Sequence, residues 1–141
     1  MAMDIFGGWP LDGALHGNAK PKASEGIVAG MFVKKDANGE LVKADGTAGE
    51  KAFFALENQS DYPVIEANKM AYIIANALVL TDQYDTGEVY GYDTNLMADS
   101  GNPGKVKPHG GGAQPVVGFS DGKVTRDGIE YLKIKLGEAL H

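Results

Sequence analysis

Residues 123–136, KVTRDGIEYLKIKL, carry the clearest structural pattern in this sequence. From Ile129 onward apolar and polar side chains alternate, which is typical of a β-strand that buries one face and exposes the other. The face expected to point inward carries Glu130, Leu132, Ile134 and Leu136, and the outward face carries Tyr131, Lys133 and Lys135. Asp127-Gly128 has the composition of a two-residue hairpin turn. We therefore expect residues 123–126 and 129–136 to pair as an antiparallel hairpin.

A second hairpin is expected in residues 31–44, MFVKKDANGELVKA. Side chains alternate on both sides of the Asn38-Gly39 pair, which favours a turn. A two-residue turn would bring two lysines into direct opposition, which is unfavourable for like charges. A four-residue loop would instead place Lys35 opposite Glu40. Charge pairing therefore favours the longer loop.

Further short strands are expected in residues 51–57, 84–92 and 115–119, because each is bounded by turn-forming residues. Residues 68–81, NKMAYIIANALVLT, are ambiguous, since several apolar side chains also recur at helical spacing. Their aromatic and β-branched residues favour strand, and Asn76 can mark a bend between two short strands. We assign this segment to strand, with a helix over residues 68–80 as the alternative.

Length and composition agree with a β-rich fold. The chain has 141 residues, which corresponds to a single domain. Its 20 glycines are about twice the usual proportion and favour a turn-rich architecture. Several short strands at regular spacing predict a mainly β protein, built as a single small β-barrel or β-sandwich.

Charge and hydropathy narrow the range of partners. A net charge of −6 argues against a nucleic-acid surface, which requires clustered Lys and Arg. The longest apolar stretch, residues 71–80, is too short to cross a bilayer, and we expect neither a signal peptide nor a membrane partner. The chain has no cysteine, so it has no disulfide framework and no thiolate metal site.

The first 25 residues differ from the rest. They lack any helical or alternating period, so we expect an extended N-terminal arm over residues 1–25 and a β-rich domain over residues 26–141. The arm nevertheless contains large apolar side chains that a solvated linker would lack. The residues expected to bind a partner are Ile5, Phe6, Trp9, Pro10 and Leu11. The alternative, in which Trp9 folds back onto its own barrel, stays open.

Two glycine-rich motifs resemble parts of a serine hydrolase. Residues 118–122 spell G-x-S-x-G, and residues 109–112 spell the HGGG string of some oxyanion holes. A hydrolase needs its nucleophile, Ser120, between a strand and a helix, and it needs the oxyanion motif on a distant loop. Here the two motifs nearly touch, and a strand is expected to follow. We interpret Ser120-Asp121-Gly122 as a β-turn and expect no catalytic residue.

Metal and anion sites are also not expected. Four acidic side chains could in principle hold calcium, but acidic groups between strands usually form a solvated rim. These are Asp82, Asp85, Glu88 and Asp93. His16, His109 and His141 share no ligand spacing. Residues 99–114 could hold an anion on backbone N–H groups, but a mobile loop between strands is the favoured interpretation. We expect no metal and no cofactor.

Three phrases of the sequence resemble the small β-rich decoration, or cement, proteins of tailed-bacteriophage heads. They are GIVAGMFVKKDANGELVKADG at residues 26–46, LVLTDQYDTGEVYGYDTNL at residues 78–96, and PVVGFSDGKV with YLKIKL near the C-terminus. The resemblance covers about four-fifths of the chain and consists of hydrophobic and turn patterns. The alanines and Asn76 within residues 68–80 depart from the pattern.

The resemblance implies a non-enzymatic virion protein. Such a protein would bind the major capsid protein on the outer surface of the assembled capsid, as a homo-oligomer and most often a trimer. It would be made in the host cytoplasm, and its N-terminal arm would dock on a neighbour. The alternative is a virion module that recognises a carbohydrate or receptor, in which Tyr84, Tyr90 and Tyr92 would form an exposed aromatic platform.

Overall fold

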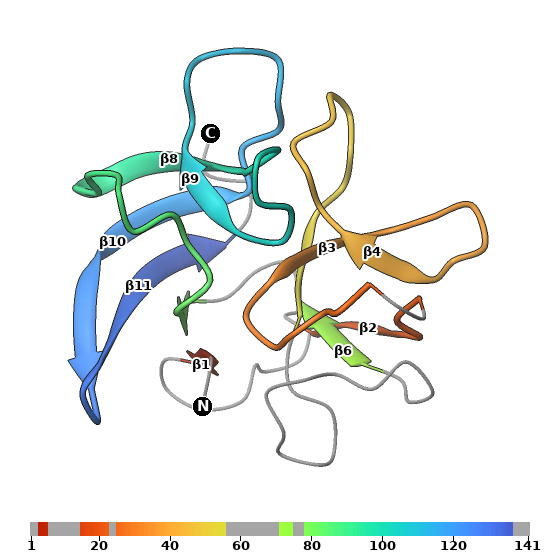
Figure 1. Ribbon diagram of the computed structural model, residues 1–141, viewed down its shortest axis with the longest axis horizontal. Coiled ribbons are helices and arrows are strands. Elements are labelled where there is room, and N and C mark those ends of the chain that lie inside the picture. Colours follow the sequence, from red (N-terminus) through yellow and green to blue (C-terminus); the bar gives the residue numbers. More distant parts are fainter. Residues whose placement is uncertain (1–2, 6–14, 23–24, 56–70, 75–77, 137–141) are drawn as a thin grey trace.

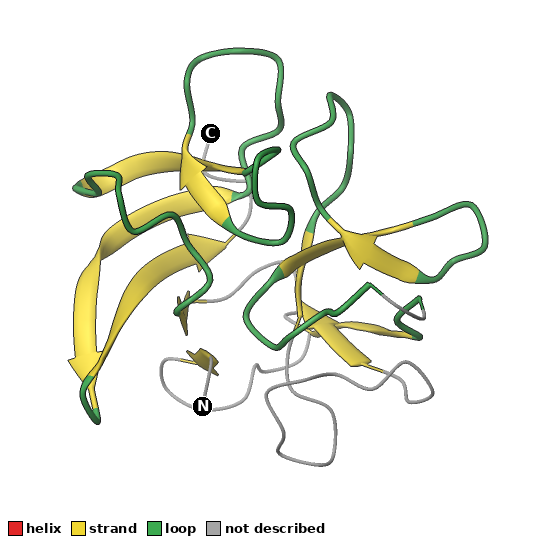
Figure 2. Cartoon of the chain, in the orientation of Figure 1, coloured by secondary structure: helices red, strands yellow, loops and turns green. Residues whose placement is uncertain are grey.

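The computed structural model describes residues 3–5, 15–22, 25–55, 71–74 and 78–136. All of the regular structure in these residues is β-strand, which confirms the mainly β prediction (Figure 2). None of the described residues forms a helix that is long and apolar enough to cross a membrane. The strands form two antiparallel sheets, here called the large sheet and the small sheet (Figure 1).

The large sheet has six strands in the order β1-β7-β11-β10-β8-β9. Their bounds are β1 Met3–Ile5, β7 Leu78–Thr81, β8 Tyr92–Ala98, β9 Val106–Pro108, β10 Gly118–Arg126 and β11 Ile129–Leu136. The predicted hairpin is confirmed, because Arg126 pairs with Ile129 across Asp127-Gly128. Both turn residues have positive φ, 51° and 81°, as a type I′ turn requires.

The two faces of β11 follow the predicted alternation with two exceptions. Leu132, Ile134 and Leu136 are buried in the core. Glu130, expected to point inward, is exposed at the end of the strand, and Tyr131, expected in solvent, is buried. Alternation fixes which residues share a face, but the surrounding strands decide how far each face is covered.

Residues 118–126 form one continuous strand, whereas the sequence predicts a β-turn at Ser120-Asp121-Gly122. The pairing of β10 with β11 shifts register between Ser120 and Lys123, which is the mark of a β-bulge. Gly122 has a φ of +86° and supplies the unusual backbone conformation there. The same residue types serve a turn and a bulge, and only the neighbouring strand distinguishes the two.

The small sheet has five strands in the order β2-β6-β5-β3-β4. Their bounds are β2 Leu15–Ala19, β3 Phe32–Lys35, β4 Leu41–Lys43, β5 Phe53–Ala55 and β6 Ala71–Ile74. The chain that follows β2 reaches the opposite edge of this sheet, because the N–H of Leu41 donates to the carbonyl of Lys20 and that of Lys22 donates to the carbonyl of Leu41. Residues 15–22 therefore close the small sheet into a ring.

The hairpin of β3 and β4 exists, but the predicted register is wrong. Lys35 lies opposite Leu41, not Glu40, so the loop between the paired residues has five residues and not four. The N–H of Gly39 donates to the carbonyl of Asp36, and the Asp36 carboxylate accepts from the N–H groups of Asn38 and Glu40. These bonds to Asp36 stabilise the observed loop more effectively than exposed charge pairing between strands.

The ambiguous segment at residues 68–81 contains two strands, as assigned, and they lie in different sheets. β6 pairs with β2 and β5, whereas β7 pairs with β1 and β11. Asn76 and its neighbours at residues 75–77 fall outside the described residues. The change of sheet between β6 and β7 explains why no single period covers the segment.

Two other predictions require correction. The strand expected in residues 84–92 is mostly loop, and β8 begins only at Tyr92. The loop expected in residues 99–114 contains β9, which pairs with β8. In both segments turn residues and strand residues are interleaved, and the long-range partner strand decides which backbone is extended.

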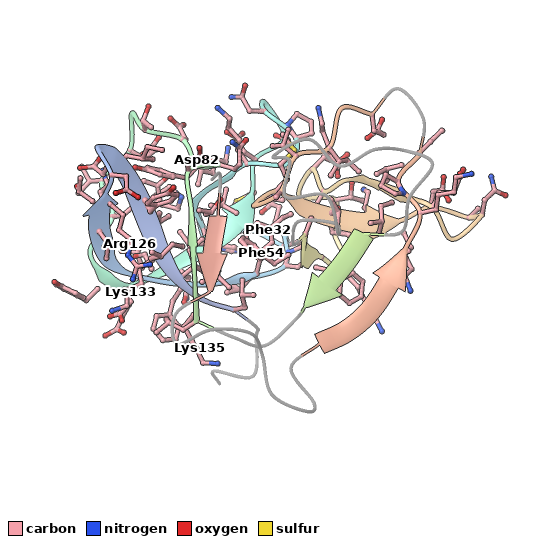
Figure 3. The ribbon with its side chains drawn as sticks, turned by 90° about the horizontal axis from the view of Figure 1, so that it is seen from below. Phe32, Phe54, Asp82, Arg126, Lys133 and Lys135 are labelled. Carbon is pink, nitrogen blue, oxygen red and sulfur yellow. The ribbon has the colours of Figure 1, made fainter. Side chains whose placement is uncertain are left out.

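The main core lies between the two sheets. Phe32 and Phe54 of the small sheet pack edge to face, with ring centroids 5.4 Å apart (Figure 3). They belong to one cluster with side chains of the large sheet, including Val79, Leu96 and Leu132. A second cluster lies on the other side of the small sheet and consists of Ala19, Ile27, Val33, Leu41 and Ala55. β3 and β5 are therefore buried on both faces.

Candidate functional site

The N-terminal residues complete both sheets. β1 is one of the two edge strands of the large sheet and pairs with β7, so that Ile5 lies opposite Val79. Residues 15–22 close the small sheet and thus belong to the β-rich body, which differs from the boundary expected at Gly26. Of the residues expected to bind a partner, the backbone of Ile5 is placed in β1. The others, Phe6, Trp9, Pro10 and Leu11, lie outside the described residues.

Two of the three candidate platform tyrosines lie inside the protein. Tyr84 is buried and Tyr90 is half-buried, and their rings pack edge to face with centroids 5.6 Å apart. The Tyr84 hydroxyl donates to the carbonyl of Glu130 at 3.1 Å. The Tyr90 hydroxyl donates to the carbonyl of Asp85 at 2.8 Å. Both rings and both hydroxyls are therefore occupied by groups of the same chain.

Lys123 covers this tyrosine pair from the surface. Its ammonium lies 5.5 Å from the centroid of Tyr84 and 5.7 Å from that of Tyr90, within the range of a cation–π contact. The same ammonium is 3.4 Å from a carboxylate oxygen of Glu130. The β-bulge in β10 precedes Lys123 and sets the direction of its side chain. Sequence patterning does not reveal this group, because its members come from separate segments.

The electrostatic environment keeps both tyrosines protonated. Burial, reinforced by the negative charge of Asp85, raises the pKa of Tyr90 well above its ordinary value. Burial, together with the charge of Glu130, also raises the pKa of Tyr84. A buried phenol ionises less readily because the anion loses its hydration. The two hydroxyls therefore act as hydrogen-bond donors and not as acids.

Tyr92 is the one member of the candidate platform with an exposed side chain, at 77%. It sits at the start of β8, opposite Asp121, and a side chain on Gly122 would contact its ring at 3.0 Å. Val89 in the preceding loop is 88% exposed. The three tyrosines thus divide between the interior and the surface, and they do not share one exposed face.

The acidic residues considered for calcium do not gather into a ligand set. Within the described residues, no three His, Asp or Glu side chains are arranged to hold a metal ion. Asp85 instead accepts a hydrogen bond from the N–H of Gly87, and Asp82 accepts one from the side chain of Gln83. Asp93 has a φ of 67° and lies in the second position of β8. The hydrogen bonds of Asp82 and Asp85 therefore lie within the loop before β8.

Ser120 and His109 are engaged with different partners. The Ser120 side chain is fully buried, and its hydroxyl donates to the carbonyl of Gly91. One ring nitrogen of His109 is 2.6 Å from the carbonyl of Gln114, and the other accepts from the N–H of Gly111. Ser120 and His109 are therefore each hydrogen-bonded to backbone groups, and within the described residues no hydrogen bond joins their two side chains to one another.

The loop considered for anion binding is organised around an acidic side chain. Asp99 is buried, accepts a hydrogen bond from the N–H of Gly101 and lies 3.7 Å from the ammonium of Lys107. Two further turns join the backbones of Asp99, Asn102 and Lys105. A carboxylate at the centre of the loop disfavours an anion there.

An ion-pair network that the sequence analysis missed holds the loop after β4. The Lys34 ammonium lies 2.9 Å from carboxylate oxygens of both Asp45 and Glu50. Glu50 is almost fully buried and also accepts from the N–H of Gly46. The Asp45 carboxylate accepts from the hydroxyl of Thr47 at 2.6 Å. Glu50 could have been noticed as an acid in a turn-rich segment, but its pairing with Lys34 depends on the hairpin register.

No protein-family model, curated protein or solved structure matches this chain.

Proposed function

We propose that this protein is a non-enzymatic structural protein of a virion. It binds the outer surface of an assembled capsid and stabilises contacts between subunits of the major capsid protein. The apolar segment from Ile5 to Leu11 docks on a neighbouring subunit, and the β-rich body supplies the rigid support. Self-association, most simply as a trimer, brings several such segments to one site.

The observation that carries this proposal is the position of the N-terminal strands. β1 is an edge strand of the large sheet, and β2 with its extension closes the small sheet. The segment between them therefore starts and ends on the folded body. Large apolar side chains at Phe6, Trp9 and Leu11 fall in this segment. Such side chains are typical anchors of protein interfaces.

The tyrosines support a structural role over ligand recognition. A platform for sugar rings needs aromatic faces in solvent. Tyr84 and Tyr90 instead pack against one another and under Lys123, with their hydroxyls bonded inside the chain. They stabilise the junction between the loop before β8 and the β10–β11 hairpin.

Several arms are needed for stable attachment. Burying Phe6, Trp9 and Leu11 contributes about 4.5 to 9 kcal/mol, at about 1.5 to 3 kcal/mol each. Ordering about ten arm residues costs about 10 to 20 kcal/mol of backbone entropy. One arm alone does not hold the protein on a capsid. Linked arms in an oligomer raise the overall affinity without any new contact.

A sedimentation assay with undecorated phage heads tests the proposal. Wild-type protein is expected to co-sediment with heads at saturable stoichiometry. The double variant Phe6→Ala/Trp9→Ala is expected to lose most of this binding, because it removes the two largest docking groups and leaves the sequences of β1 and β2 unchanged. Tyr92→Ala is the matched control and is expected to bind normally.

Three outcomes would contradict the proposal in different ways. Wild-type protein that fails to bind any heads would remove the capsid role. Full binding by the Phe6→Ala/Trp9→Ala variant would remove the docking role of the arm. Loss of binding in Tyr92→Ala with the arm variant unaffected would shift the contact to the exposed aromatic surface.

A further inference from the structure

We infer that the edge of β7 covered by β1 is a strand-acceptor site, and that in an oligomer its occupant is β1 of a second copy of this chain. Within one chain, β1 occupies this edge through three residue pairs. They are Met3 with Thr81, Asp4 with Leu80 and Ile5 with Val79. This exchange of β1 between copies takes place in purified protein, without a capsid.

The edge of β7 has to be covered by a strand. Val79, Leu80 and Thr81 are all fully buried, so β7 is enclosed on both faces. One edge pairs with β11, and the other pairs with β1. Buried backbone N–H and C=O groups require partners, and an open edge would recruit another strand. Some extended segment must therefore lie beside β7.

β7, the acceptor strand, is held by more interactions than β1, the strand that covers its edge. The Thr81 hydroxyl donates to the carbonyl of Gly30 at 2.8 Å, and four residue pairs join β7 to β11. In the described part of the chain, β1 pairs with β7 and with no other strand. It contributes three residues, which gives few hydrogen bonds. A short strand held along one edge is readily replaced by an identical one.

The chain length allows β1 to reach another copy. Residues 6–14 separate β1 from β2, and β2 lies in the other sheet. A span of this length reaches at most about 30 Å when extended. The bonds that a second copy makes with β7 are the same as those made within one chain, which is the condition for exchange of an identical element. Self-association raises the local concentration of β1 and favours the exchanged form.

A second copy fits this edge better than an unrelated peptide. The same sequence in the same register satisfies the pairs already formed with β7. In the exchanged form, residues 6–14 link β1 on one copy to β2 of the other, and this link contains the proposed capsid-docking residues Phe6 to Leu11. The acceptor edge and the proposed capsid-docking segment are therefore compatible in one assembly.

Disulfide trapping between single-cysteine variants tests the inference, because the natural chain has no cysteine that could compete. Directly opposed residues of antiparallel strands have Cα atoms about 4.5 to 5.5 Å apart, within the range that a disulfide can bridge. Met3→Cys protein is mixed with Thr81→Cys protein at high concentration, oxidised gently and run on a non-reducing gel. We expect a linked dimer in the mixture, well above the amount in either variant alone.

A matched pair on β2 provides the control. Asn18 lies opposite Tyr72, and the residues after β2 are bonded to Leu41 in the same sheet. Asn18→Cys and Tyr72→Cys proteins are therefore expected to give no linked dimer when mixed, although the double variant closes a disulfide within one chain. Equal dimer yields for the β1 and β2 pairs would indicate random collision and overturn the inference.

The remaining outcomes also decide the question. If the double variant Met3→Cys/Thr81→Cys forms only an internal disulfide and the mixture gives no dimer, β1 stays with its own chain and the inference is wrong. If neither disulfide forms, β1 does not occupy the β7 edge. Should Thr81→Cys fail to fold, Ile5→Cys with Val79→Cys gives the same test, because these residues are also directly opposed.

Discussion

The N–H of Gly104 donates to the carbonyl of Ala44 at 2.9 Å and thereby joins the loop between β8 and β9 to the end of β4. The carbonyl of Gly104 accepts from the N–H of Phe32, also at 2.9 Å. A loop of the large sheet is thus bonded to two strands of the small sheet. This junction lies beside the shared core and fixes how the sheets pack.

Gly104→Ala is expected to destabilise the protein by about 2 to 4 kcal/mol, because strain at positive φ adds to overpacking of a buried site. Gly104 has a φ of +93°, and a Cβ there would lie 2.8 Å from the sulfur of Met31. Gly111→Ala is the control, since Gly111 has a similar φ of +89° and open space around it. Chemical denaturation measures both. Equal losses in the two variants would show that crowding at Met31 is unimportant.

Ser120→Ala is expected to lower the free energy of unfolding by about 1 to 3 kcal/mol, because it leaves the Gly91 carbonyl without its buried donor. Ser100→Ala, at an exposed position, is expected to be nearly neutral. Thermal and chemical unfolding of both variants check this. A hydrolytic activity of wild-type protein that disappears in Ser120→Ala at unchanged stability would instead assign Ser120 a catalytic role.

Thr47→Ala is expected to weaken the loop after β4 in a pH-dependent way. Hydrogen bonding from the Thr47 hydroxyl, assisted by Lys34, holds the pKa of Asp45 below its usual range. A lowered carboxyl pKa stabilises the folded state above the unfolded value of about 4, and this stabilisation is lost as pH falls through the folded pKa. The variant should therefore be less stable than wild type by about 0.5 to 1 kcal/mol at neutral pH.

The difference between wild type and Thr47→Ala should shrink below about pH 4, as the carboxyl begins to take up protons. Unfolding curves at several pH values measure it. Thr125→Ala, in an exposed position on β10, is the control and should show no such trend. A difference that is constant from neutral to strongly acid pH would contradict the assigned role of Asp45.

Tyr90→Phe is expected to cost about 0.5 to 1.5 kcal/mol, because it removes the donor to the Asp85 carbonyl. It should also reduce the alkaline loss of stability. Burial raises the pKa of Tyr90, so the folded state retains a proton that the unfolded chain releases above about pH 10. Stability is therefore complete below that pH and falls as pH rises toward the folded pKa.

Near-ultraviolet absorbance of tyrosinate, recorded with unfolding curves at high pH, checks the Tyr90 prediction. The last step of the tyrosinate titration should disappear in Tyr90→Phe. Tyr92→Phe, which alters an exposed ring, should leave that step in place. If the last step survives in Tyr90→Phe, another buried tyrosine, such as Tyr84, accounts for it.

Local patterns in the sequence predict those elements whose conformation depends on nearest neighbours. The hairpin across Asp127-Gly128 is one example, because its turn type and its flanking alternation lie within a few residues of each other. The interpretation of residues 68–81 as two strands also holds, since β-branched and aromatic side chains disfavour a long helix. In each case local chemistry and the final sheet favour the same backbone.

Register and strand limits depend on distant residues. In the β3–β4 hairpin, the hydrogen bonds to Asp36 are formed and the predicted pairing of Lys35 with Glu40 is not. Residues 84–91 look like a strand but form a loop, in which the rings of Tyr84 and Tyr90 pack against one another and beneath Lys123. No spacing rule within one segment reveals such a contact.

By itself the sequence determined that this protein is β-rich and how its clearest hairpin turns, because alternation and turn chemistry are properties of neighbouring residues. Only the tertiary structure decided that Ser120 forms part of a bulge, that Tyr84 is buried and Tyr90 half-buried, and that residues 15–22 close the small sheet. These features arise when strands far apart in the chain are brought together, since hydrogen bonding and burial are then set by the partner and not by the segment.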